Sequence, residues 1–578
     1  MKRSRLLVFV IVLTMITTLF ATPVSAVLDT SDTLTAHEAE FLALLNYDHA
    51  DYLAHYLSEE IGNRITFSPR RDMATEWLLD EFESYGYEPY TQDFVYTTTP
   101  TVNGLIWIDG DHYAYYGPTW NASTVYQYDD SDEVAINGAV VVDWPNSGQA
   151  FVAPDADYTG KAVFVTLNGS APNAANFYNA ALTLQDAGAA AVMFQTVPMA
   201  ENGNTTYSRI GNATEGDAIN IPVGTTLNYE TSGILSSLDD NSVVKLNLYA
   251  NNVGKNVIAV LPSATGNEKT VYITSHYDSM QSGPGMNDNG SGTIMTLEMA
   301  RAFKEWKFDY NLVFIIFDAE ESGLRGAYAY CEQMSQEERA GFVANYNMDM
   351  IATSQENCEW MFMNISDARL RIIDRSYTDT NVALADYPEA VAIAEEYGIY
   401  NTTMLAAKKL GRADNLLFCY DTTTDHYAFV RYGNGDYDNH VNMMNAVEYD
   451  WRSNRKGTAF EMLYHKAGDT YELNFSIDKC KYQSDIIALA IYHAARGDIE
   501  LEGVVAKASV LKQNGNKNLL TVTVTETWTN YEDITYEIIY AETISINNNA
   551  AGIYSVDDYA VYVDTKGNDQ IRACYLVN

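Results

Sequence analysis

A run of apolar positions at helical spacing follows Ser68 and Pro69 near the start of the chain. Serine is a favoured helix cap, and proline is tolerated in the first turn because an N–H there would have no helical partner. The apolar positions are Ala74, Trp77, Leu78 and Phe82. Their spacing predicts an amphipathic helix that begins after Ser68 and ends before Gly86, with a strand to follow in "EPYTQDFVY".

Between Gly254 and Arg496, short apolar runs alternate with stretches of helical periodicity. This alternation is typical of proteins in which helices cover both faces of a sheet. It predicts an α/β fold with a central mixed, mostly parallel sheet flanked by helices. The predicted strands are Val257–Val260, Val271–Thr274 and Leu312–Phe317, and the predicted helices are Gly290–Trp306 and Ser484–Ala495. We expect Ser484 to cap the last helix.

Two other regions have a different pattern. From about Val102 to Asn251 the chain is rich in Gly, Ala, Asn and Thr, and its short apolar runs indicate an inserted β-rich domain. After Gly497 apolar residues recur at every second position, as in "LLTVTVTETW", which predicts a small all-β appendix. The predicted segments are a leader (1–26), the first part of the main domain (27–100), the insert (101–251), the rest of the main domain (252–497) and the appendix (498–578).

The N-terminus has the features of a secretory signal peptide. Lys2, Arg3 and Arg5 precede an apolar run from Leu6 to Phe20, and the small residues of "VSA" follow, up to Ala26. The apolar run is short for a membrane span. We therefore expect cleavage after Ala26 and an exported mature protein that has no membrane span.

Charge and cysteine content narrow the classes of partner. The formal net charge is −42, which argues against nucleic acid or an anionic membrane surface as a partner. The five cysteines fit no zinc-finger spacing, and their odd number leaves at least one thiol without an intrachain partner. Export permits disulfides, but the sequence does not determine their pairing.

Five short stretches carry the candidate chemistry, and each lies at or near the end of a predicted strand or in a loop. Ligands of open α/β sheets bind at such strand ends. The stretches are "VYITSHYDS" with His276 and Asp278, "GPGMNDNGSGT" with Asp288, "FIIFDAEESGLRG" with Glu320 and Glu321, "ANYNMDMI" with Asp349, and "MLYHKAGDT" with Tyr464, His465 and Asp469. Taken singly, each has an ordinary structural explanation, such as a solvated turn or a hydrogen-bonded pair. Together they form a set of imidazoles and carboxylates that suits zinc.

A cation would explain why adjacent carboxylates follow a buried strand. Charge is costly to bury, but a bound metal keeps nearby carboxylates ionised. Two ions need a shared carboxylate, and Asp288 in its glycine-rich loop is placed to bridge them. In this interpretation one of Glu320 and Glu321 binds metal, and its neighbour acts on water.

These motifs resemble those of the secreted co-catalytic di-zinc aminopeptidases, the family that includes aminopeptidase Y and the bacterial leucyl aminopeptidases. The resemblance is carried by "HYDS", "GPGMNDNGSGT", "FDAEESGLRGA", "NMDMI" and "YHKAGDT", and it spans about residues 51–94 and 254–496. It implies a zinc-dependent exopeptidase fold. The insert resembles the protease-associated domain that several relatives carry at the same place.

The resemblance also implies a role for each site residue. His276, Asp288 and Asp349 would hold one Zn²⁺, and Asp288, Glu321 and His465 would hold a second. Glu320 would be the general base, Asp278 would orient His276, and Tyr464 would steady the oxyanion. The implied function is a secreted metallopeptidase that releases N-terminal residues from peptide substrates by attack of zinc-activated water.

Other interpretations of the same motifs remain open. A carboxypeptidase of the same family would need a basic pocket, for which Arg325 and Arg412 are the candidates. A glutaminyl-cyclase-like acyltransferase typically works with one zinc, whereas this sequence retains every ligand for two. A binding protein with a decayed site, as in the transferrin receptor, is disfavoured by the intact Glu320. His426 in "TTDHYAF" is interpreted as a buried structural histidine.

Overall fold

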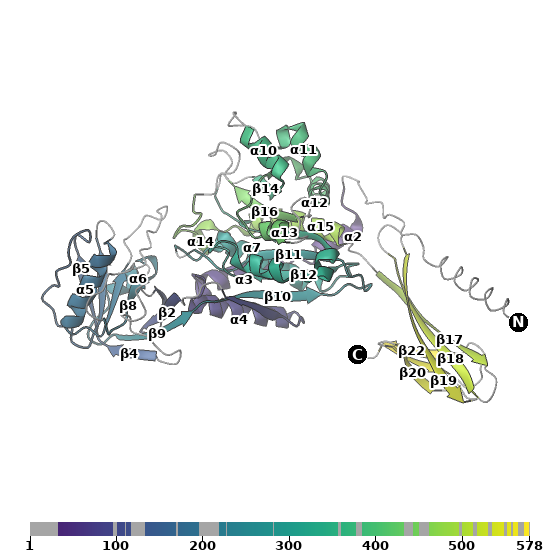
Figure 1. Ribbon diagram of the computed structural model, residues 1–578, viewed down its shortest axis with the longest axis horizontal. Coiled ribbons are helices and arrows are strands. Elements are labelled where there is room, and N and C mark those ends of the chain that lie inside the picture. The colour runs from purple at the N-terminus through teal and green to yellow at the C-terminus, as the bar shows by residue number, and fades with distance from the viewer. Residues whose placement is uncertain are drawn as a thin grey trace. The chain divides into compact units, whose positions relative to one another are not determined.

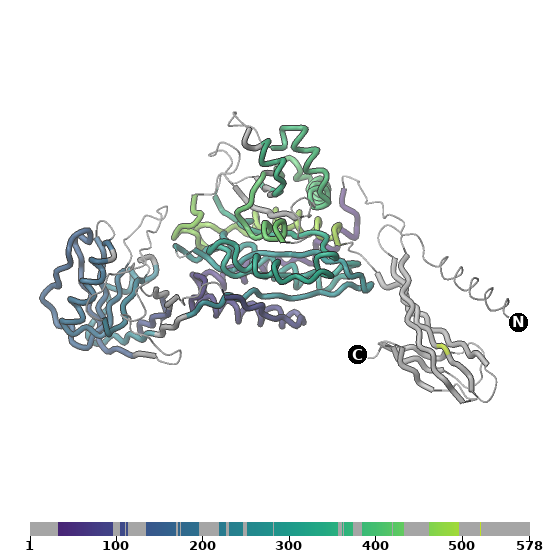
Figure 2. The backbone as a smooth tube through the Cα atoms, in the orientation of Figure 1, coloured from purple at the N-terminus to yellow at the C-terminus, as the bar shows by residue number. Residues whose placement is uncertain are grey.

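A computed structural model gives the arrangement of most of the chain (Figures 1 and 2). The residues that it describes are 33–95, 101–109, 111–116, 133–168, 172–195, 219–226, 228–280, 282–355, 360–376, 384–432, 443–449, 462–495, 500–512, 517–529, 535–547, 552–556, 559–563 and 571–576. They belong to two compact units, one from Asp32 to Ala495 and one that contains residues 496–578. The two units are described separately below.

The helix expected after Ser68 is present as α4 (Pro69–Ser84). Its cap forms as predicted, because the Ser68 hydroxyl accepts a hydrogen bond from the Arg71 N–H. The chain then turns at Gly86, whose φ of +82° is a conformation that glycine adopts without strain. Strand β1 (Tyr90–Val95) follows, as the sequence indicates.

A mixed eight-stranded sheet forms the centre of the larger unit, in the order β1-β10-β12-β11-β13-β16-β14-β15. The further strands are β10 (Val253–Leu261), β11 (Thr270–His276), β12 (Asn311–Phe317), β13 (Phe342–Met348), β14 (Trp360–Asn364), β15 (Leu416–Cys419) and β16 (Met443–Tyr449). Strands β12, β11, β13 and β16 are parallel neighbours, whereas β1, β10 and β14 introduce antiparallel pairs. This architecture confirms the predicted α/β fold class.

Helices pack on both faces of this sheet. On one face α7 contacts β11, β12 and β13, and α15 contacts β13; on the other, α8 and α13 cover an aromatic-rich core. Outside residues 101–251, the helices that the structure describes besides α4 are α2 (Ala36–Leu42), α3 (Tyr47–His55), α7 (Ser291–Phe303), α8 (Arg325–Gln333), α9 (Gln336–Gly341), α10 (Ala368–Ser376), α11 (Pro388–Ala394), α12 (Gly398–Lys409), α13 (His426–Tyr432), α14 (Tyr471–Asn474) and α15 (Ile477–Ala494). Shorter helical turns are η1 (Tyr56–Ile61), η2 (Met286–Gly290), η3 (Leu384–Asp386) and η4 (Ala413–Asn415).

The predicted start of the last of these helices was wrong. Helix α15 begins at Ile477, and Ser476 caps it by accepting a hydrogen bond from the Lys479 N–H. Ser484 lies two turns inside the helix and is buried there. Either serine is a suitable helix cap by residue type. The stretch between them is largely polar, so the first two turns of the helix show no clear apolar periodicity in the sequence.

A second eight-stranded sheet contains the strands between β1 and β10 of the main sheet (Figure 1). Its order is β4-β9-β2-β3-β8-β7-β6-β5, with bounds β2 (Thr101–Ile108), β3 (Asp111–Tyr116), β4 (Glu133–Asn137), β5 (Ala139–Trp144), β6 (Ala162–Leu167), β7 (Ala191–Gln195), β8 (Val223–Thr226) and β9 (Val243–Asn251). Helices α5 (Ala174–Asp186) and α6 (Asn228–Leu235) lie in the same region of the chain. Two separate apolar cores include residues of this sheet. Because β2 pairs with β9 and β1 with β10, the chain enters and leaves this region at one place.

The smaller unit contains two antiparallel three-stranded sheets. The first consists of β17 (Glu500–Lys512), β18 (Lys517–Thr529) and β19 (Thr535–Asn547), and the second of β20 (Gly552–Val556), β21 (Tyr559–Val563) and β22 (Ile571–Leu576). The predicted leader lies outside the described residues. Among the helices that the structure does describe, none is long and apolar enough to cross a bilayer.

Candidate metal centre

The candidate ligands gather where three parallel strands end. His276 is the last residue of β11, Asp349 directly follows β13, and Glu320 and Glu321 come shortly after β12. Because parallel neighbours direct their carboxyl ends to the same edge, residues from distant parts of the sequence meet here. Asp288 enters from η2, and His465 from the loop that precedes α14.

The five predicted ligands form two groups that share Asp288. In the first, His276 Nε2 lies 3.4 Å from Asp288 Oδ1 and 3.5 Å from Asp349 Oδ1. In the second, His465 Nε2 lies 3.0 Å from Asp288 Oδ2 and 3.2 Å from Glu321 Oε2. The two oxygens of one carboxylate thus face two different imidazoles. This is the arrangement that a bridging ligand between two ions requires.

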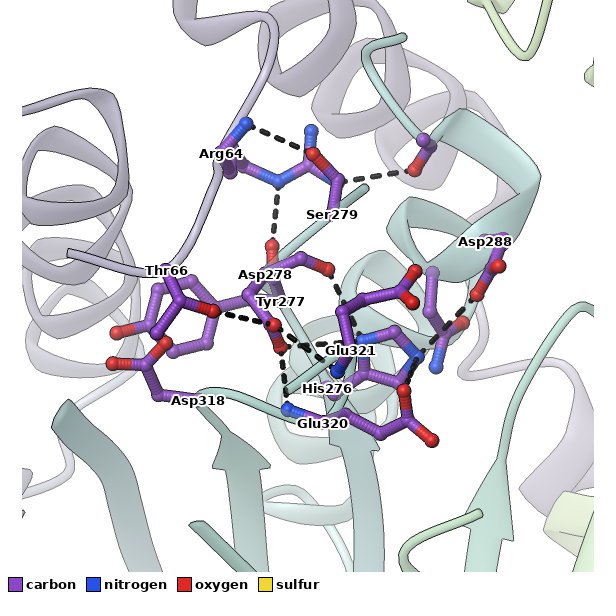
Figure 3. Close-up of polar contacts among 12 residues, drawn as sticks. Arg64, Thr66, His276, Tyr277, Asp278, Ser279, Asp288, Asp318, Glu320 and Glu321 are labelled. Carbon is purple, nitrogen blue, oxygen red and sulfur yellow. Dashed lines mark hydrogen bonds and ion pairs between the residues drawn. The ribbon is translucent and has the colours of Figure 1, made fainter. Parts of the chain in front are cut away.

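Asp278 connects the first group to the backbone beside it (Figure 3). Its Oδ1 accepts a hydrogen bond from the Glu320 N–H at 3.0 Å and lies 3.5 Å from His276 Nδ1. Its Oδ2 accepts the Glu321 N–H at 3.3 Å and the Thr66 hydroxyl at 2.9 Å. The hydrogen bond of His276 Nδ1 is made with the Asp278 backbone carbonyl oxygen, at 3.1 Å. Asp278 therefore contacts the imidazole through its backbone, and its carboxylate holds the segment that carries both glutamates, which is the kind of support that metal ligands need.

Negative charge predominates in the site. The carboxylates near the two imidazoles include those of Asp278, Asp288, Glu320, Glu321, Asp349 and Asp425. Burial raises the pKa of Glu320 well above its ordinary value even though His276 opposes it, and burial together with Asp288 raises the pKa of Glu321 to about 7. Burial would lower the pKa of His465, but Asp288 and Glu321 raise it to about 10. The site attracts positive charge.

The donor set fits zinc. Zinc accepts imidazole nitrogen and carboxylate oxygen, and both groups offer one nitrogen with two carboxylates. Four buried atoms of these ligands have no hydrogen-bond partner among the described residues: His276 Nε2, Asp288 Oδ2, Glu321 Oε1 and Asp349 Oδ1. Buried polar atoms normally have hydrogen-bond partners. A cation bound between these atoms would explain why they have none.

The remaining predicted residues are less central. Tyr464 stacks on the imidazole of His465, with ring centroids 3.6 Å apart, and burial raises the pKa of its hydroxyl. His426 is fully buried and its Nε2 lies 2.9 Å from the Ser366 hydroxyl, and burial lowers its pKa to about 4. A neutral imidazole held in this way agrees with its structural interpretation. Cys331 and Cys480 are buried free thiols.

Sequence reasoning assigned no role to several residues that support the site. Asp318 forms an ion pair with Arg71, with 3.1 Å between Asp318 Oδ2 and Arg71 Nη1, and both side chains are fully buried. The buried Arg64 guanidinium donates to the carbonyl oxygens of Tyr277, Pro284 and Gly285. No local pattern distinguishes such an arginine, because its partners are backbone atoms far away in the sequence. Asp469 has a stronger signal, since it lies four residues after a candidate ligand.

Comparison with known proteins agrees with this chemistry. Residues 256–488 match the model of peptidase family M28. The chain is 27% identical over 326 residues to aminopeptidase YwaD of Bacillus subtilis, which covers 55% of the chain and 60% of the relative. It is 26% identical over 303 residues to a probable leucine aminopeptidase 2 of Aspergillus fumigatus, covering 50% and 55%. A solved structure of a Bacillus subtilis zinc aminopeptidase aligns with a TM-score of 0.44 and 22% identity, covering 78% of this chain and 95% of that one.

The match of residues 256–488 to peptidase family M28 confirms the resemblance seen in the motifs. All five candidate ligands and Glu320 lie inside this segment. The chain spans 60% and 55% of the lengths of these two curated relatives.

Proposed function

We propose that the protein is a zinc aminopeptidase with two metal ions. The observation that carries this proposal is the pair of ligand groups that share Asp288, with Glu320 beside them. The relatives named as aminopeptidases support the reaction class. Zinc held by these residues would supply Lewis-acid chemistry, which makes water a better nucleophile near neutral pH.

Glu320 is the proposed general base. Its Oε2 lies 3.9 Å from His276 Nε2, so its carboxylate faces the first ligand group without belonging to it. A base in this position takes a proton from the attacking water and later passes it to the leaving amine. Asp278 holds the Glu320 backbone in place, and Tyr464 beside His465 is the proposed donor to the developing oxyanion.

The excess of carboxylates supports specificity for a free N-terminus. A substrate ammonium group is attracted to this negative field, whereas a C-terminal carboxylate is repelled by it. Arg412, one of the two basic candidates for a carboxypeptidase pocket, pairs with Asp485 at 3.1 Å instead. We also propose export of the protein, on the strength of the basic, apolar and small residues at its N-terminus.

One experiment tests the reaction and the metal together. Purified protein should contain about two zinc ions per chain, and should cleave a free aminoacyl-anilide but not its N-acetylated counterpart. A chelator should abolish cleavage, and added zinc should restore it. Equal cleavage of the N-acetylated substrate would contradict an aminopeptidase, and full activity without bound metal would contradict the zinc mechanism.

A further inference from the structure

A buried hydrogen-bond network joins the three loops that carry the shared and neighbouring ligands. Asp469 lies at its centre and is only 2% exposed. Its Oδ1 accepts hydrogen bonds at 2.8 Å from the Asn287 N–H and the Asn474 side-chain amide. Its Oδ2 accepts the Asp288 N–H at 3.0 Å. The carboxylate therefore holds the backbone of the shared ligand itself.

The same network extends to the loop after Asp349. Asn474 Oδ1 accepts the Thr353 hydroxyl at 2.6 Å, and Asn287 Oδ1 accepts the Ala352 N–H at 3.0 Å. The loops that follow β13, that contain η2 and that carry His465 are thus connected through fully or nearly buried groups. All of these contacts are made between protein atoms.

Close packing leaves the glycine-rich loop little freedom to move away from Asp469. The Asp469 carbonyl oxygen also accepts the Met286 N–H at 3.0 Å. A Cβ atom added to Gly283 would lie 2.5 Å from the Lys466 carbonyl oxygen, which is closer than real Cβ contacts allow. The backbone of the two loops is therefore in direct contact just beside the ligand positions.

We propose that Asp469 is a positioning residue that sets the place of Asp288, and through it the zinc affinity of both ligand groups. The inference rests on the proposed zinc function. Because Asp288 is shared, moving it disturbs both ions, whereas the loss of a ligand such as Glu321 directly affects only one. Residues that support metal ligands in this way typically contribute about 10–100-fold in metal affinity.

Asp469→Asn is the informative substitution because it keeps the shape of the side chain. Both carboxylate oxygens act as acceptors, so an amide in either orientation places its NH₂ group against a backbone or side-chain N–H. Asp309→Asn is the matched control. Asp309 is also buried and accepts a hydrogen bond, from the Thr265 hydroxyl at 2.6 Å, but it precedes β12 at the opposite end of the strand from the site.

The test measures zinc content and zinc affinity by competition with a chelator, using the full chain. We expect affinity to fall by about 10–100-fold in Asp469→Asn, with both ions affected, and to remain at the wild-type value in Asp309→Asn. Asn474→Ala removes one donor to Asp469 and should produce a smaller loss in the same direction. Melting curves with and without zinc separate this effect from a general loss of stability.

Retention of both zinc ions at wild-type affinity in Asp469→Asn would overturn the inference. If that variant does not fold, wild-type affinity in Asn474→Ala would overturn it instead. A wild-type chain that binds no zinc would overturn the proposed function and this inference together. Normal zinc binding in the wild type and in Asp469→Asn would overturn the positioning role alone.

Discussion

The carboxylates around Asp288 and the carboxylate of Glu38 are both buried, but their charges are balanced differently. Glu38 in α2 is fully buried, and its Oε1 lies 3.2 Å from Lys409 Nζ and 3.0 Å from His493 Nε2. Its Oε2 accepts the Thr35 N–H at 2.7 Å. Burial would raise the pKa of Glu38, but His493, the Thr35 N–H and Lys409 together lower it.

The metal centre has the opposite balance. Around Asp288 the carboxylates outnumber the imidazoles, and burial raises the pKa of both Glu320 and Glu321. Glu38 has basic side chains of the chain itself beside it, whereas the carboxylates of the metal centre outnumber its basic side chains. A buried acidic residue is therefore informative about metal only when its neighbours are counted as well.

The largest effect is expected when the shared ligand is removed. Asp288→Asn replaces the one carboxylate that faces both imidazoles, so both ions should be lost and cleavage of an aminoacyl-anilide should fall to background. Zinc content of the purified variant and its turnover are the measurements. A variant that retains two zinc ions would show that the ligand groups do not share Asp288.

Glu38→Gln is the control for this comparison. It also removes one buried carboxylate, but from the cluster that has its own cations. We expect it to lower stability while the zinc content stays at the wild-type value. Zinc loss in both variants would mean that general destabilisation, and not ligand removal, accounts for the effect.

Much of the fold and the ligand set could be predicted from local patterns. Strands β10, β11 and β12 of the main sheet appear as apolar runs, and Ser68 with Pro69 marks the start of α4. The candidate ligands stand out only as a set, because Asp349 and the Glu320–Glu321 pair both follow buried strands, where charge is costly. The motif resemblance then supplied the individual roles that spacing could not.

What escaped prediction depends on contacts between distant segments. The Asp469 carboxylate holds residues that are 181 and 182 positions away, and Arg64 binds carbonyl groups more than 200 positions away. Because these partners are backbone groups, which every residue has, the pattern of side chains along the sequence does not reveal them. The misplaced start of α15 has a local cause, since Ser476 and Ser484 are equally good caps by residue type.

Glu320 and Glu321 test the centre at the level of single roles. Glu320→Gln removes the proposed base but no ligand, so zinc should stay bound while turnover falls by about 10²–10⁴-fold. Glu321→Gln removes an anionic donor from the second group, so one ion should bind more weakly and excess zinc should restore part of the activity. If the Glu320 variant loses metal while the Glu321 variant keeps it, the two roles are reversed.

The smallest effect concerns the stability that Glu38 contributes and its dependence on pH. Because the pKa of Glu38 is lowered in the folded protein, its contribution is complete above the ordinary glutamate pKa of about 4.3. It is lost as pH falls through the folded value, where the carboxylate takes up a proton. Removing one partner of a buried ion pair typically costs about 3–5 kcal/mol, so Glu38→Gln should unfold more easily than the wild type at neutral pH.

The difference in unfolding free energy between the two proteins, measured by denaturant titration, should be constant from about pH 5 to 7 and shrink below about pH 4.3. Because zinc loss at low pH affects both proteins alike, this difference isolates Glu38. A difference that grows as pH falls would contradict the lowered pKa, and with it the view that Lys409 and His493 stabilise the Glu38 carboxylate.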